Sequence, residues 1–140
     1  MAVFYADASA LVKLVREEAE SAALRAFLVD AKLVSSELVL TEVPRAVRRA
    51  AARDPTLALG LLLERAAKLV DALALHPVNH DLLAGAGALA EPVLRSLDAI
   101  HVASAVGLAP IEVFVTYDER QAAAARLAGL RTVAPGLPTA

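Results

Sequence analysis

The chain has 140 residues, a net charge of −2 and no cysteine, which excludes disulfide bonds and thiolate metal ligands. Hydrophobic residues make up 58% of the chain and aromatic residues only 4%, a mixture that favours helices packed on a short-stranded sheet. The chain begins without a basic leader and has no apolar run of about 18 residues, which predicts a cytoplasmic protein with no membrane segment.

Short apolar runs alternate with helical periodicity along the chain. In chain order we expect strand 2–6, helix 10–15, helix 18–30, strand 32–35, helix 37–53, helix 56–72, strand 73–78, helix 81–89, helix 94–106, strand 113–116, helix 119–128 and strand 131–133. This alternation predicts an α/β fold with a short, mostly parallel sheet of about four to five strands and helices on both faces. No repeat or linker divides the chain, so we expect one domain over residues 1–134 and a C-terminal tail, 135–140, that frays.

Polar residues and a proline predict where several helices begin or break. Ser9, Ser36, Asn79 and Ser96 are expected to cap the helices that follow them, because their side chains can accept hydrogen bonds from the first backbone N–H groups. Pro44 lies inside the third helix and should kink or split it, since its ring removes one hydrogen bond and clashes one turn back.

Four acidic residues lie where they can converge. Asp7 and Asp118 come just after apolar strands, and the carboxyl ends of parallel strands meet at one edge of a sheet, where ligands bind. Asp98 lies in the first turn of an otherwise apolar helix, where an ionised carboxylate is costly to bury unless a cation or donors meet it. Glu42 lies on a helix face with apolar neighbours and is the fourth candidate.

These acids predict a metal site, although each also has a structural alternative. Carboxylates gathered in one cleft without matching Lys and Arg cannot all stay ionised unless a cation neutralises them. Oxygen ligands favour Mg²⁺ or Mn²⁺ over zinc. Alternatively, Asp7 and Asp118 cap helices, Asp98 interacts with a helix macrodipole, and Glu42 points to solvent.

Basic residues follow Glu42 on its own helix face. Arg45, Arg49 and Arg53 come three, seven and eleven residues after it, which predicts a stripe that contacts the phosphates of a nucleic acid. A solvated face or an acidic protein partner explains the same stripe. His101 follows Asp98 by three residues, and we expect it to be a hydrogen-bonded core residue rather than a ligand.

Four sequence blocks in this order and spacing resemble the PIN-domain ribonucleases, and among them the VapC toxins of toxin–antitoxin pairs. The blocks are residues 3–9, Glu42 after Ser35-Ser36, residues 97–105 and residues 115–120. The resemblance implies a three-layer α/β/α domain that binds Mg²⁺ or Mn²⁺ and cuts RNA. It also implies a homodimer and a cognate antitoxin that covers the site.

Carried over to this chain, the resemblance makes Asp7, Glu42, Asp98 and Asp118 the catalytic acids and metal ligands, with Ser9 and Thr116 as supporting residues. Two other functions are compatible with the sequence. One is a non-catalytic interaction module that binds a partner through residues 37–72, and the other is a phosphatase with Asp7 as nucleophile. The phosphatase reading lacks the second nearby acid that such chemistry needs.

Overall fold

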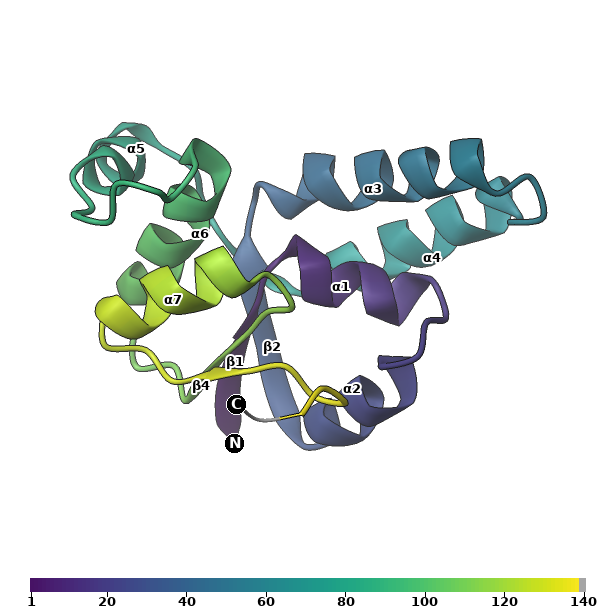
Figure 1. Cartoon of the computed structure of the whole chain (residues 1–140), viewed down its shortest axis with the longest axis horizontal. Coiled ribbons are helices and arrows are strands. Elements are labelled where there is room, and N and C mark those ends of the chain that lie inside the picture. Colours follow the sequence, from purple (N-terminus) through teal and green to yellow (C-terminus); the bar gives the residue numbers. More distant parts are fainter. Residues whose placement is uncertain (139–140) are drawn as a thin grey trace.

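A parallel sheet lies between two helix layers in the computed structural model, which describes residues 1–138 (Figure 1). The elements, in chain order, are β1 (Ala2–Ala6), α1 (Ala8–Val15), α2 (Ser21–Leu28), β2 (Ala31–Ser36), α3 (Val39–Arg53), α4 (Leu59–Asp71), β3 (Ala74–His76), α5 (His80–Gly87), α6 (Ser96–Gly107), β4 (Val113–Val115), α7 (Glu119–Leu127) and β5 (Thr132–Val133). The strand order is β3-β2-β1-β4-β5, and every pairing is parallel. β1 therefore lies at the centre of the sheet.

The alternation of side chains along β1 explains the two helix layers, because successive strand residues point to opposite faces. Phe4 and Ala6 belong to the core formed with α1, α2, α3 and α4. Tyr5 belongs to the second core, which is formed with α6 and α7. Figure 1 shows these two groups of helices on either side of the strands.

The structure confirms the predicted three-layer α/β/α fold. Each expected strand and helix is present, and their bounds differ from the predicted ones by at most three residues. The sheet is entirely parallel, where a mostly parallel one was predicted. Within the described residues, no helix is long and apolar enough to cross a membrane.

Two predicted helix caps are wrong. Asp7, not Ser9, is the N-cap of α1 and accepts a hydrogen bond from the backbone of Ala10 at 3.1 Å. The Ser9 hydroxyl donates to Asp7 instead, because a carboxylate is the stronger acceptor. Ser96 is the first residue of α6 rather than its cap, and the capping position belongs to Arg95, whose side chain makes no capping hydrogen bond.

The beginning of α3 also differs from the prediction. Leu38 occupies the capping position, and Ser36 accepts a hydrogen bond from the Leu38 backbone at 3.1 Å. α3 continues through Pro44 without a break, so of the predicted kink or split the split is wrong and the kink stays a prediction. The proline removes a single backbone hydrogen bond, and burial of Val43 and Val47 against the core holds the helix on both sides of it.

The first residues of the predicted tail contact the domain. The Tyr117 hydroxyl donates to the Pro135 carbonyl at 2.7 Å, and Gly136 adopts a positive φ of 90° beside Glu20 and Ala23 of the α2 region. Glycine suits this position because other residues rarely adopt such a backbone conformation. The boundary at residue 134 stays a prediction, and residues 139–140 lie outside the described part of the chain.

Candidate active site

The four predicted acids lie near the carboxyl edge of the sheet. Asp7 follows β1, Asp118 follows β4, Glu42 lies in the first turn of α3 after β2, and Asp98 lies in the first turn of α6. Burial raises the pKa of Asp98, and the negative charge of Asp118 raises it further, with smaller effects of Asp7 and Glu42. Because such effects weaken with distance, the four acids share one region of the protein.

Asp7 is the most buried of the four, with 3% of its surface exposed. Its Oδ1 accepts hydrogen bonds from the Ser9 hydroxyl at 2.6 Å and from the Ala10 backbone at 3.1 Å. Its Oδ2 accepts from the Thr116 hydroxyl at 2.5 Å and from the Gln121 amide. Burial raises the pKa of Asp7, while the donors from Ser9 and Thr116 lower it. Four donors fix both oxygens of this carboxylate in place.

Thr116 links Asp7 to Asp118. Its hydroxyl donates to Asp7 and accepts a hydrogen bond from the Asp118 backbone at 3.0 Å. Asp118 is the N-cap of α7, and its Oδ1 accepts from the backbones of Arg120 at 2.9 Å and Gln121 at 3.3 Å. Asp118 therefore does cap a helix, as its structural alternative predicted, and this capping role uses Oδ1 but not Oδ2.

Glu42 does not simply point to solvent. Its Oε1 lies 2.6 Å from Nε2 of His101, and Nδ1 of His101 lies 2.7 Å from the Tyr5 hydroxyl. His101 is 1% exposed and Tyr5 is fully buried. His101 is thus the hydrogen-bonded core residue that we expected, but its partner is one of the candidate metal ligands.

The donor set fits a hard divalent cation in chemistry and charge. The four acids supply only oxygen ligands, and the negative charges of Asp118, Asp7 and Glu42 disfavour ionisation of Asp98, an effect that a divalent cation would offset. In the observed side-chain positions, however, no three acidic or histidine side chains of residues 1–138 are grouped closely enough to hold a metal ion. Ion binding therefore requires some of these carboxylates to turn toward one another.

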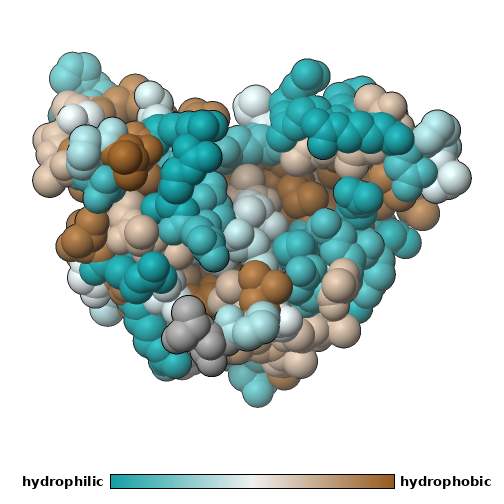
Figure 2. All heavy atoms as spheres, viewed as in Figure 1, coloured by the Kyte–Doolittle hydropathy of each residue, from teal (hydrophilic) through white to brown (hydrophobic). Residues whose placement is uncertain are grey.

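The predicted basic stripe lies beside this region. Arg45 and Arg49 are exposed on α3, and neither pairs with an acidic side chain within residues 1–138. Figure 2 shows hydrophilic side chains gathered over α3, next to a hollow that separates this helix from α5 and α6. A contact of these arginines with nucleic acid stays a prediction.

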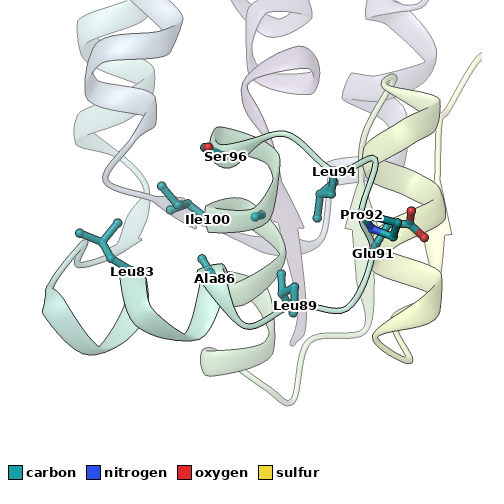
Figure 3. Close-up of a pocket in the computed structure, with 10 residues that line it drawn as sticks. Leu83, Ala86, Leu89, Glu91, Pro92, Leu94, Ser96 and Ile100 are labelled. Carbon is teal, nitrogen blue, oxygen red and sulfur yellow. The ribbon is translucent and has the colours of Figure 1, made fainter.

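A cavity of about 450 Å³ lies elsewhere, between α5, α6 and the segment that joins them (Figure 3). Leu83, Leu89, Leu94 and Ile100 line much of it, and none of the four acids does. Its lining offers few polar groups for catalysis, so we do not place the active site there.

Sequence reasoning missed two residues of the site and underrated a third. Gln121 lies on an alanine-rich helix, three residues after Asp118. Its burial is what distinguishes it from a surface glutamine, and that burial is visible only in the folded structure. Tyr5 lies in β1, two residues before Asp7, which directly follows the strand. His101 was noted for its spacing from Asp98, but its link to Glu42 was not predicted.

Comparisons with known proteins agree with the geometry. Residues 4–127 match the model of the PIN domain family. The chain is 38% identical to Ribonuclease VapC35 of Mycobacterium tuberculosis, over 96% of this chain and 98% of that protein. It is 39% identical to Ribonuclease VapC46 and 34% identical to Ribonuclease VapC47 of the same organism, over 96% of this chain and at least 98% of each relative.

Proposed function

Because this chain belongs to the PIN-domain family and, within it, to the VapC ribonucleases, we propose that it is a metal-dependent endoribonuclease and the toxin of a toxin–antitoxin pair. The observation that supports the site assignment is that four acids follow elements ending or beginning at one sheet edge, where the charges of Asp118, Asp7 and Glu42 raise the pKa of Asp98 in addition to its burial. A polyanionic substrate can approach such a site only when a cation offsets the carboxylates.

Asp7, Glu42, Asp98 and Asp118 would hold the ion, which we propose to be Mg²⁺ or Mn²⁺. When bound, such an ion makes a water molecule more acidic and stabilises charge on the phosphoryl oxygens. The part played by the protein is orientation: the donors from Ser9 and Thr116 hold Asp7 in a fixed geometry before any ligand arrives. This preorganisation removes the cost of ordering the carboxylate at the moment of reaction.

The phosphatase alternative has no support in this geometry. Asp7 is 3% exposed, which hinders its attack on the phosphorus atom of a bulky substrate more than its contact with a small ion. An orienting ligand, by contrast, is compatible with strong hydrogen bonding.

Three partners complete the proposal. Arg45 and Arg49 would contact RNA phosphates next to the site, and a cognate antitoxin would cover the site at rest. We also propose a homodimer, supported by apolar side chains exposed near the α5–α6 cavity. These are Leu83, Val93 and Leu97, which are 47%, 65% and 49% exposed.

The experiment compares cleavage of a labelled RNA by the purified chain in EDTA, Mg²⁺ and Mn²⁺, with Asp98→Asn as the test variant. Asp81→Asn is a matched control, because Asp81 also lies in the first turn of a helix but is fully exposed. We expect RNA cleavage only with a divalent ion, and we expect Asp98→Asn to lower the cleavage rate by about 10- to 100-fold. Equal activity of the two variants would refute the site assignment.

A further inference from the structure

We propose that His101 is a positioning residue for the metal site: a neutral imidazole, oriented by Tyr5, holds one oxygen of Glu42 and leaves the other oxygen for the ion. The inference rests on the proposed function, because it takes Glu42 as a ligand. It assigns to His101 and Tyr5 a task that neither performs by contact with metal or RNA.

The geometry joins three elements through two hydrogen bonds. Tyr5 comes from the central strand β1, His101 from α6 and Glu42 from α3. The Glu42 Oε1 to His101 Nε2 distance is 2.6 Å, and the His101 Nδ1 to Tyr5 hydroxyl distance is 2.7 Å. The two rings also pack edge to face, with centroids 5.9 Å apart. Both ring nitrogens are occupied, so the imidazole has a single orientation.

The polar atoms determine where the hydrogens lie. An ionised carboxylate can only accept, so Nε2 of His101 carries the hydrogen that Glu42 receives. We infer that Nδ1 accepts the second hydrogen bond and that the Tyr5 hydroxyl donates it, so that the ring carries a single hydrogen. An ordinary tyrosine hydroxyl carries its proton at neutral pH and can donate it.

A neutral donor has a specific advantage at this position. A lysine or arginine beside Glu42 would fix the carboxylate but would also cancel the charge that attracts the ion. A neutral N–H orients the carboxylate and leaves most of its charge available, as outer-shell partners of metal ligands do. Only Oε1 of Glu42 is engaged by His101, and Oε2 stays available for coordination.

The position of the network connects it to the other ligands. His101 lies one turn after Asp98 on α6, and Tyr5 lies two residues before Asp7 on β1. The same two hydrogen bonds therefore fix the elements that carry Asp7, Glu42 and Asp98 relative to one another. Loss of the Tyr5 hydroxyl should loosen Glu42 without emptying the core.

The first test is the nitrogen NMR spectrum of the metal-free protein with labelled histidine. We expect His101 to be protonated at Nε2 and bare at Nδ1, and we expect Tyr5→Phe to give a mixture of the two tautomers. Tyr117→Phe is the matched control, because its hydroxyl donates to the Pro135 carbonyl outside the network. A native His101 that carries its hydrogen at Nδ1 overturns the inference without any variant.

The second test measures Mn²⁺ affinity by calorimetry for Tyr5→Phe, Glu42→Ala and the double variant. Tyr5→Phe should weaken binding by about 10-fold, and the loss should disappear in the Glu42→Ala background. An equal loss in both backgrounds, or none in either, means that Tyr5 and His101 are only structural and overturns the inference. If Glu42→Ala leaves Mn²⁺ affinity and RNA cleavage unchanged, Glu42 is not a ligand, and the assignment made under the proposed function fails as well.

Discussion

Replacement of Gln121 by glutamate perturbs the buried side of the site with almost no change in shape. In the native protein the Gln121 amide donates to Oδ2 of Asp7, and Gln121 is 1% exposed. The variant Gln121→Glu puts a second carboxyl against Asp7 in a buried position. Two carboxylates cannot both stay ionised there, so the introduced carboxyl has to bind a proton.

The cost can be worked out from protonation alone. A glutamate has an ordinary pKa of about 4.3, so holding it protonated at pH 7 costs about 3.7 kcal/mol, at about 1.36 kcal/mol per pH unit. Once protonated, it again donates to Asp7, and no further hydrogen bond is lost. At pH 5 the same cost is only about 1 kcal/mol. The folded-state pKa of the introduced carboxyl is raised, so the variant gains stability relative to the native chain as pH falls.

The assay is urea unfolding of both proteins in EDTA at pH 7 and pH 5, each with its own slope and midpoint. We expect the difference in the free energy of unfolding to shrink by about 2 to 3 kcal/mol between the two pH values. Gln121→Leu is the control, because it removes the donor without adding a titratable group and should show little pH dependence. A pH-independent difference for Gln121→Glu would refute the contact with Asp7.

Three further predictions concern charge and assembly. Burial and the charge of Asp118 raise the pKa of Asp98, so the free energy of unfolding of the metal-free protein should rise as pH falls through that raised pKa toward about 4. Asp98→Asn should reduce this gain in urea unfolding. An unchanged pH profile in the variant would contradict the prediction. The double variant Arg45→Ala, Arg49→Ala should weaken RNA binding, and the slope of log affinity against log salt concentration should fall by about two, measured by titration at several salt concentrations. A weaker affinity with an unchanged slope would exclude phosphate contacts by these arginines. Leu97→Glu should shift the protein toward the monomer in sedimentation, and an unaltered mass would place the dimer contact elsewhere.

The Glu42–His101 pair shows how the acids of this site can be both fixed and charged. Asp7 is held by neutral hydroxyl, amide and backbone donors, and Glu42 is held by an imidazole that we infer to be neutral. Lys13 forms its ion pairs in a separate cluster, with Glu18 and Glu20. Neutral donors orient carboxylates without competing with a cation for their charge.

The sequence by itself determined the features that depend on near neighbours in the chain. Apolar runs and helical periodicity predict the strands and helices, and the position of Asp7 and Asp118 after strands predicts that they lie at one sheet edge. These predictions succeed because a parallel sheet brings strand ends together whatever the details of packing. The helix caps were less secure, since Ser9 and Asp7 compete for the same backbone donors and the carboxylate is the stronger acceptor.

Only the tertiary structure decided which distant side chains meet. Gln121 and Asp7 are 114 residues apart in the chain, His101 and Tyr5 are 96 apart, and His101 and Glu42 are 59 apart. Whether such a pair forms depends on the rotation of each helix about its axis, which is fixed by packing of apolar side chains on the sheet and leaves no local trace in the sequence. The four acids could thus be predicted from the sequence, whereas the residues that orient them are determined by the packing of α3, α6 and α7 on the sheet.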